Sequence, residues 1–255
     1  MRIRILGCSG GIGAGSRTSA MMIDNDVLLD AGTGVGDLPL EELHSIRHVF
    51  LTHAHLDHIA GLPMLIDSIF TETVDVPVTV YGRRETLEAI KAHLFNWVIW
   101  PDFSKLPNEE NPMLRYVVCN PGDTVTIDHR AFFAVDVEHS VPSIGYTVQN
   151  SGGVFAVSGD TRTNKTLWPV LNDCDDLRVL LIEVSFPNEL EELAAAAGHY
   201  CPNTLCRDLA LLEPDPDIWI TGMKPGEEER ILNQVLEGSG NRNIRMLSRG
   251  TVIIV

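Results

Sequence analysis

A dense run of titratable side chains constrains this sequence more than any other feature. Residues 52–58 read Thr-His-Ala-His-Leu-Asp-His, so three imidazoles and one carboxylate lie within six residues. The run follows Val49 to Leu51, an apolar stretch typical of a buried strand. Groups this close together repel one another or lose protons unless a cation holds them. The run therefore predicts a metal site rather than a surface loop with chance histidines.

The spacing of these ligands indicates two ions rather than one. A single loop can direct His53 and His55 toward one ion and Asp57 and His58 toward another. Histidine and aspartate are ligands that suit zinc, iron or manganese. We therefore predict two divalent ions, with Zn²⁺ as the first choice and Mn²⁺ or iron as alternatives.

Two further candidate ligands come from distant parts of the chain. His139 follows one predicted strand, and Asp160 follows another. Taken singly, a His or Asp at the end of a strand is more often a turn or capping residue. The run at 52–58 needs additional ligands that it cannot find locally, so we predict that both residues join the metal site.

Length and charge limit the function classes. The chain has 255 residues without a clear linker, so we predict one domain over residues 1–255. It carries 19 basic and 35 acidic side chains, a formal net charge of -16. Because gripping a long nucleic acid requires many Lys and Arg side chains, we expect no such partner. A cationic metal pocket in an acidic protein suits a small anionic substrate.

The cysteines and the hydropathy of the sequence indicate in which cellular compartment the protein works. The five cysteines are scattered and form no CxxC pair, and residues 1–4 lead directly into a strand-like run. We therefore predict a cytoplasmic protein. No apolar stretch approaches the length of a membrane helix, so we expect no membrane association. A homodimer is a common default among soluble proteins.

Strand-like segments come in clusters, with helical segments after them. This order favours packed mixed or antiparallel sheets with flanking helices over a doubly wound parallel fold. Two hairpins are predicted, one across Asp24-Asn25-Asp26 and one across residues 150–153. Residues 96–121 are rich in Pro, Asn and Trp and predict an irregular excursion, whose aromatic residues form a small satellite core or stack on a nucleobase.

The motifs together resemble the metallo-β-lactamase superfamily. The likeness rests on residues 52–58, on His139 and on Ser158-Gly159-Asp160-Thr161. It implies an α+β fold, a four-layer αββα sandwich of two mixed sheets flanked by helices, with metals at the sheet edge. The resemblance further implies ligand roles: a first metal on His53, His55 and His139, a second on Asp57 and His58, and Asp160 as a bridge.

Within the superfamily, the chain most resembles the class II cyclic-nucleotide phosphodiesterases. Their signature is His-x-His-Leu-Asp-His, an aliphatic residue, any residue, and Gly, and residues 53–61 match it. This likeness implies hydrolysis of 3′,5′-cyclic nucleotides such as cAMP by a metal-activated hydroxide. It also implies catalytic roles for Asp57, which orients the attacking hydroxide or takes its proton, and for His199, which protonates the leaving oxygen. Arg17, in a polar loop, is a candidate substrate contact.

The pattern breaks at one position. In the family a histidine commonly completes the second metal site in a Thr-His-x-Lys-Pro segment, where this chain reads Thr221-Gly222-Met223-Lys224-Pro225. Gly222 has no side chain and cannot ligate. The second metal then takes water in that position, binds weakly, or recruits His199.

Three other functions stay open. The first is a tRNA 3′-processing endonuclease, although no Lys or Arg occurs between His139 and Asp160, where such enzymes insert a basic arm. The second is a thioester, lactone or sulfate-ester hydrolase, because one scaffold hosts many chemistries. The third is a degenerate protein that binds metal or nucleotide without catalysis, a reading that only Gly222 supports.

Overall fold

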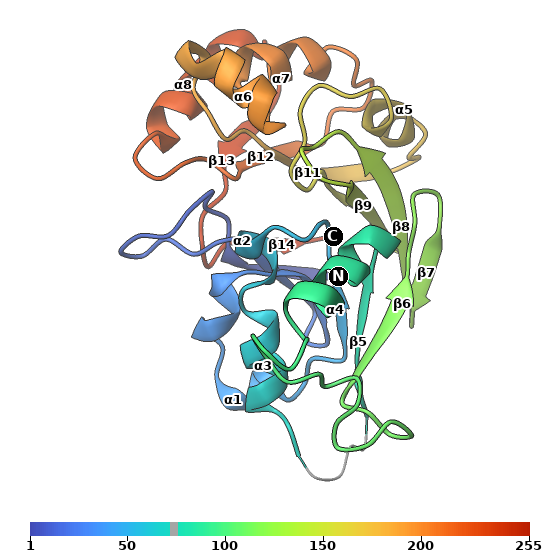
Figure 1. Cartoon of the computed structure of the whole chain (residues 1–255). Helices are drawn as coiled ribbons and strands as arrows, with labels where there is room; N and C mark the ends of the chain where they lie inside the picture. The colour runs from blue at the N-terminus through green and yellow to red at the C-terminus, as the bar shows by residue number, and fades with distance from the viewer. Residues whose placement is uncertain (72–75) are drawn as a thin grey trace.

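Two β-sheets face each other and carry helices on their outer sides, as the computed structural model shows for residues 1–71 and 76–255 (Figure 1). The first sheet has the strand order β14 (Val252–Ile254), β1 (Arg2–Gly7), β2 (Ala20–Ile23), β3 (Val27–Ala31), β4 (His48–Phe50), β5 (Val78–Gly82) and β6 (Leu114–Val118). The second has the order β13 (Ile244–Met246), β12 (Asp217–Thr221), β11 (Leu177–Glu183), β10 (Gly153–Val157), β9 (Ser143–Asn150), β8 (Arg130–Val137) and β7 (Thr124–Ile127).

Both sheets are mixed. In the first, β14, β1, β2 and β3 pair antiparallel, and β3 to β6 pair parallel. In the second, β10 to β13 pair parallel, whereas β7 to β10 pair antiparallel. The α+β sandwich expected from the sequence is thus confirmed, as are the hairpins β2–β3 and β9–β10.

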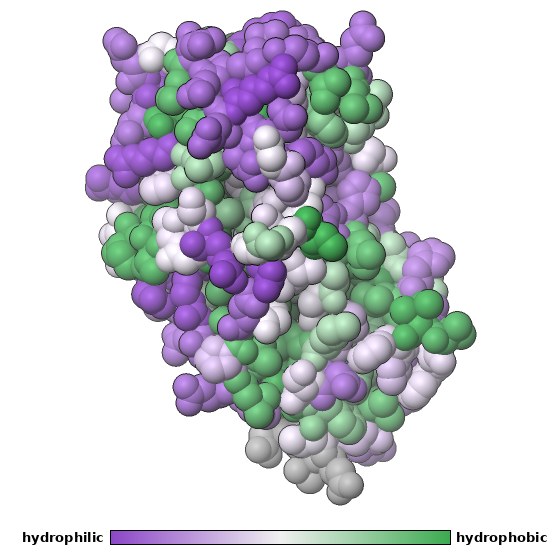
Figure 2. Space-filling view, turned by 90° about the vertical axis from the view of Figure 1, so that its left-hand side faces the viewer, coloured by the Kyte–Doolittle hydropathy of each residue, from purple (hydrophilic) through white to green (hydrophobic). Residues whose placement is uncertain are grey.

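Short helices cover the outer faces. Those of the first half are η1 (Thr33–Asp37), α1 (Leu40–Leu43), α2 (Leu56–Ile59), α3 (Leu62–Ser68) and α4 (Arg84–His93). Those of the second half are α5 (Leu167–Asn172), η2 (Asn188–Leu190), α6 (Glu191–Ala197), α7 (Pro202–Leu209) and α8 (Glu228–Gly238). The surface over α6 to α8 is mainly hydrophilic, and hydrophobic patches lie lower on the same face (Figure 2). No described helix has the length and hydropathy needed to cross a membrane.

An aromatic cluster joins the two sheets. Phe50 of β4 stacks on Tyr81 of β5 and on Phe132 of β8, with ring centroids 4.4 and 4.1 Å apart. Tyr146 of β9 meets the Phe50 ring edge-on and donates a hydrogen bond from its hydroxyl to the carbonyl oxygen of Leu51 at 3.0 Å. This packing fixes the end of β4, and therefore the segment that follows it, against the second sheet.

The expectation for residues 96–121 is wrong in two respects. Residues 114–118 form β6, an edge strand whose apolar sequence Leu-Arg-Tyr-Val-Val was obscured by the Pro and Asn residues on either side of it. The aromatic residues also do not form a separate core: Phe95 and Phe103 are buried in the main cluster under the first sheet, and Trp100 packs against it. Trp97 is 56% exposed at a turn.

Candidate metal centre

The titratable run leaves β4 and folds back across the sheet edge. Ile144 donates its backbone N–H to the carbonyl oxygen of Thr52, and the backbone N–H of Gly61 donates to Ala31. A Cβ atom at Gly61 would lie 2.5 Å from the carbonyl oxygen of Gly32, so only glycine allows this close approach. These contacts press α2 onto β3 and turn Asp57 and His58 toward the second sheet.

Six side chains predicted as ligands form two groups that share one carboxylate. Four residues offer donor atoms that all lie within 4.8 Å of one another: His53, His55, His139 and Asp160. Three offer donor atoms within the same limit: Asp57, His58 and Asp160. The structure therefore brings together residues from the ends of β4, β8 and β10, and it places Asp160 between the two groups.

Three of the imidazoles, those of His53, His58 and His139, have a partner at Nδ1. Nδ1 of His53 lies 3.0 Å from Oγ1 of Thr52, and Nδ1 of His139 lies 2.8 Å from the carbonyl oxygen of Gly198. Nδ1 of His58 lies 2.6 Å from Oδ2 of Asp30. Such outer partners fix ring orientation in metal sites and leave Nε2 free to ligate. Nε2 of His58 indeed faces Asp160, 3.4 Å from its Oδ1.

The donor set fits a divalent ion. Nε2 of His53 is buried and has no hydrogen-bond partner in the described part of the chain, and a buried polar atom without a partner is rare. It points toward Oδ2 of Asp160, 3.9 Å away. A cation between these groups would satisfy the nitrogen and neutralise the carboxylate.

The histidines of the four-donor group are neutral at physiological pH. Burial lowers the pKa of His139 to about 4 and lowers the pKa of His53 well below its usual range. Neutral imidazole is the form that binds metals. Burial alone would raise the pKa of Asp160, but the neighbouring His58 and His53 outweigh it and hold that pKa well below its usual value. Asp160 is therefore an anion ready to ligate.

His199 lies beside the two groups without joining them. Its Nδ1 atom is 3.0 Å from Oε1 of Glu183, 3.1 Å from Oγ of Ser185 and 4.0 Å from Oδ2 of Asp160. Burial by itself lowers the pKa of His199, but the charge and hydrogen bond of Glu183, together with Asp160, raise it overall. The ring is thus suited to carry and give up a proton.

Sequence reasoning missed the role of Glu183. This residue ends β11 and is 1% exposed, and its Oε1 accepts hydrogen bonds from the backbone N–H groups of Thr161 and Tyr200. It therefore ties the Asp160 loop to the His199 segment. A carboxylate directly after the apolar run Val179–Ile182 was the available signal, because a charge that ends a buried strand needs partners.

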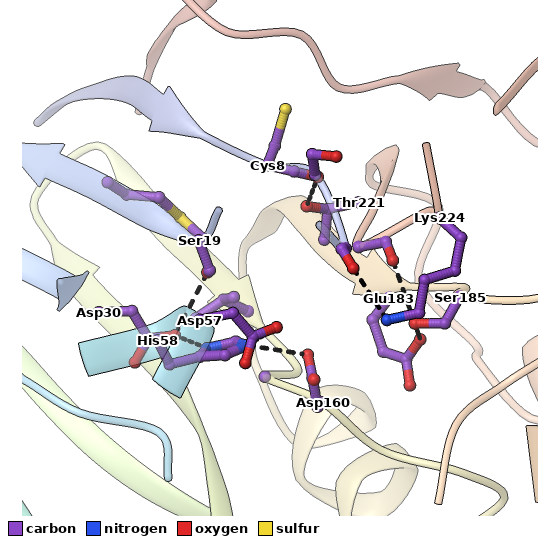
Figure 3. Close-up of a pocket in the computed structure, with 16 residues that line it drawn as sticks. Cys8, Ser19, Asp30, Asp57, His58, Asp160, Glu183, Ser185, Thr221 and Lys224 are labelled. Carbon is purple, nitrogen blue, oxygen red and sulfur yellow. Dashed lines mark hydrogen bonds and ion pairs between the residues drawn. The ribbon is translucent and has the colours of Figure 1, made fainter. Parts of the chain in front are cut away.

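A small cavity adjoins the three-donor group (Figure 3). Asp57, His58 and Asp160 line one side of it, and Glu183, Ser185 and Lys224 lie on the other. Gly222, at the end of β12, also lines this cavity. The residue that departs from the family pattern thus lines the same cavity as the three-donor group.

Arg17 lies away from this cavity. Its guanidinium forms an ion pair with Asp37, with Nε 3.0 Å from Oδ2. Arg17 lines a neighbouring groove, and Cys8 and Ser9 line both this groove and the cavity. Its role as a substrate contact stays a prediction.

Comparison with known proteins agrees with this geometry. Residues 25–217 match the family described as "Beta-lactamase superfamily domain". A 3′,5′-cyclic-nucleotide phosphodiesterase from Aliivibrio fischeri is 30% identical over 251 residues, which cover 82% of this chain and 74% of that protein. A probable 3′,5′-cyclic-nucleotide phosphodiesterase from Yersinia pestis is 27% identical over 252 residues, which cover 82% of this chain and 71% of that protein. A ribonuclease Z from Clostridium beijerinckii is 33% identical over 160 residues, which cover 56% of this chain and 47% of that protein.

Solved structures share the fold. Unliganded yeast PDE1 superposes with a TM-score of 0.82 at 20% identity and covers 100% of this chain and 99% of its own. The short form of human tRNase Z superposes with a TM-score of 0.70 at 17% identity, and the match covers 100% of this chain and 99% of that chain. With the ligand groups at the sheet edge and the match over residues 25–217, the chain belongs to the β-lactamase superfamily and is one of its metal-dependent hydrolases.

Proposed function

We propose that this chain is a phosphodiesterase that hydrolyses 3′,5′-cyclic nucleotides such as cAMP. The observation that carries the proposal is the pair of donor groups that share Asp160, in a chain whose relatives with this name cover most of its length. Two divalent ions held there would lower the pKa of a water molecule and neutralise charge on a phosphoryl group. We propose Zn²⁺ for both positions, with Mn²⁺ or iron as alternatives.

The ligands follow the two groups. His53, His55 and His139 would hold the first ion, Asp57 and His58 would hold the second, and Asp160 would contribute its carboxylate to both. This assignment is supported by the inward Nε2 atoms of His53 and His58 and by the outer partners of three of the rings.

Two side chains act on protons. Asp57, with its side chain 37% exposed, orients the attacking water and accepts its proton. His199 donates a proton to the leaving 3′-oxygen, and Glu183 orients the ring through Nδ1. General acid and base groups of this kind contribute roughly 10²- to 10⁴-fold each.

The substrate class follows from size and charge. A net charge of -16 opposes a long polyanion, whereas a small cyclic phosphodiester needs only the cationic centre. We further propose that residues 1–255 act as one domain, that the protein works in the cytoplasm, and that it forms homodimers.

A tRNA 3′-processing endonuclease is the second candidate, since ribonuclease Z is among the relatives. Against it, the fully described stretch between His139 and Asp160 folds as the hairpin β9–β10 and contains no basic arm.

A substrate panel tests the proposal. Zn²⁺-loaded protein is assayed with 3′,5′-cyclic AMP, 3′,5′-cyclic GMP, bis(p-nitrophenyl) phosphate, a thioester and a precursor tRNA, with chelator-treated protein as the control. We expect cyclic-nucleotide turnover that disappears without metal. Precursor tRNA cleavage or thioester hydrolysis without cyclic-nucleotide turnover would overturn the proposal, and metal-loaded protein inert on every ester would indicate a binding protein.

A further inference from the structure

We infer that the two metal positions are unequal: the four-donor group retains one Zn²⁺ tightly, and the three-donor group holds a second Zn²⁺ that exchanges readily. The inference rests on the proposed function, because it takes both groups to be metal sites. Its physical basis is the different number of protein donors in the two groups and the cavity that Gly222 lines beside the three-donor group's residues.

The four-donor group is built to bind. Its His53 is fully buried, and the rings of His53 and His139 are already oriented by Thr52 and by the carbonyl oxygen of Gly198. Four donors complete the tetrahedral set that holds zinc firmly in proteins. Nε2 of His139 also lies 3.1 Å from Nδ1 of His55, so these two nitrogens already face each other.

The three-donor group is poorer on two counts. The three-donor group shares Asp160 with the four-donor group, so Asp57 and His58 are the two donors that belong to it alone. Of these, the Asp57 side chain is 37% exposed, whereas the His58 side chain is 5% exposed. Three protein ligands are typical of zinc positions that keep one place open for water or substrate.

The two other carboxylates that line the cavity, and the thiol beside them, are already engaged. Asp30 accepts hydrogen bonds from the backbone N–H and Oγ1 of Thr52 and bonds to His58. Glu183 is bonded to His199, Ser185 and two backbone N–H groups. Sγ of Cys8 lies 3.5 Å from the carbonyl oxygen of Leu247. None of these described residues belongs to the three-donor group.

His199 does not supply a fourth donor to this group either. Its Nδ1 atom is occupied by Glu183 and Ser185, and the ring belongs to neither group of convergent donors among the described residues. The fourth position of the second site is therefore left to water or to a substrate oxygen.

Gly222 is the position from which a fourth donor can come. Its φ is +75°, a conformation that histidine adopts more readily than most non-glycine residues. A Cβ atom there would meet Cβ of Glu183 at 3.4 Å and Oγ of Ser185 at 3.8 Å, which are ordinary contacts. A Cβ atom at 222 thus fits against its neighbours, and the strain of a positive φ is the cost of any residue other than glycine there.

The inference can be tested without any substrate. Bound metal is stripped with a chelator, the chelator is dialysed away, and the metal-free protein is titrated with Zn²⁺ in a calorimeter. We expect two binding events per chain whose dissociation constants differ at least ~10-fold, the scale that a lost ligand-shell contact produces. Elemental analysis after dialysis should find one retained Zn²⁺. Asp57→Asn, at a half-exposed position, should remove only the weaker event.

Gly222→His should tighten the weaker event at least ~10-fold. Gly226→His is the matched control: Gly226 also has a positive φ, of +90°, but it is exposed and does not line the cavity. Circular dichroism confirms folding of each variant.

The outcomes separate the two proposals. Two Zn²⁺ of equal affinity in the unmodified protein would overturn this inference and leave the proposed function standing, and so would a folded Gly222→His protein with an unchanged weaker event. Absence of any Zn²⁺ binding would instead refute the metal-dependent function. If Gly222→His does not fold, the unmodified protein and Asp57→Asn still decide the matter.

Discussion

Nδ1 of His58 lies 2.6 Å from Oδ2 of Asp30, and both side chains are buried. Asp30 has a φ of +55° at the end of β3, and its carboxylate also accepts the backbone N–H of Thr52 at 2.9 Å. One carboxylate therefore orients the ring of His58 and the segment that carries His53. A non-glycine residue in this conformation is uncommon, and it often marks a functional constraint.

We expect Asp30→Asn to weaken Zn²⁺ binding and cyclic AMP turnover by ~10- to 100-fold, as loss of an outer partner of a metal ligand does. Asparagine tolerates a positive φ, so the change isolates the carboxylate charge. Asp128→Asn is the control, since Asp128 has a φ of +52° on an exposed turn. Equal effects of the two substitutions would contradict a positioning role for Asp30.

Asp57→Ala should lower cyclic AMP hydrolysis at least ~100-fold, because it removes the group proposed to accept the proton of water. The side chain is 37% exposed, so the melting temperature of the metal-free protein should change little. Asp67→Ala, on an exposed position of α3, provides the comparison. Activity within threefold of the unmodified enzyme would rule out this role.

His199→Ala should reduce kcat by ~10²- to 10⁴-fold while the Zn²⁺ content stays the same, because the ring lies outside both ligand groups. Glu183→Gln should produce a smaller loss and lower the pKa of His199, since Glu183 helps to raise it. NMR titration of the ring in metal-free protein measures that pKa. A drop in Zn²⁺ content in His199→Ala would instead make His199 a ligand.

Removing the metal should destabilise the protein in a pH-dependent way. Zn²⁺ at a thousandfold excess over Kd adds ~4 kcal/mol to the folded state, a rise of ~8–16 °C in Tm for a chain of this size. Burial lowers the pKa of His139 to about 4, so the folded protein keeps this ligand neutral well below pH 6.5.

The sign of the pH effect follows from that depressed pKa. In metal-free protein, the unfolded chain binds the proton of His139 first, so stability should fall as the pH drops from about 6.5 toward 4. The Tm increase caused by Zn²⁺ should shrink near pH 4, where His139 becomes protonated. Differential scanning calorimetry at several pH values checks both trends, and a metal-induced Tm shift that stays constant down to pH 4 would exclude His139 as a ligand.

Asp26→Asn should destabilise the protein by about 1.5–3 kcal/mol at pH 7, the range for hydrogen bonds to charged groups. Arg130, 2% exposed, pairs with Asp26 through two contacts of 2.7 Å and so joins β8 to the β2–β3 turn. Burial alone would raise the pKa of Asp26, but Arg130 lowers it below 3.8. This stabilisation is present above pH 3.8 and is lost as pH falls through the folded pKa, so urea curves of variant and parent should converge at low pH.

The ligands in residues 53–58 could be predicted from local density, because groups this close repel one another or lose protons unless a cation holds them. His139 and Asp160 could be predicted only as candidates, since each follows a strand and the sequence does not show which strand ends meet. The hairpins and the αββα layers also followed from local patterns and from the superfamily resemblance.

Other parts depended on contacts between distant residues. β6 is a short apolar segment within a stretch rich in Pro and Asn, and only its pairing with β5 shows that it is a strand. Glu183 gains its role only because β11 ends next to the His199 segment. The pairing of Arg17 with Asp37 depends in the same way on the approach of two loops.

The sequence by itself determined which chemistry this protein can carry, because clustered imidazoles and carboxylates are the donor types that divalent ions take. Only the tertiary structure decided how these groups divide into four donors and three, and that Gly222 lines the same cavity as the three-donor group. The physical reason is that ligation depends on distances of a few ångströms between side chains from different strands. Those distances are set by the pairing of the sheets and the packing between them.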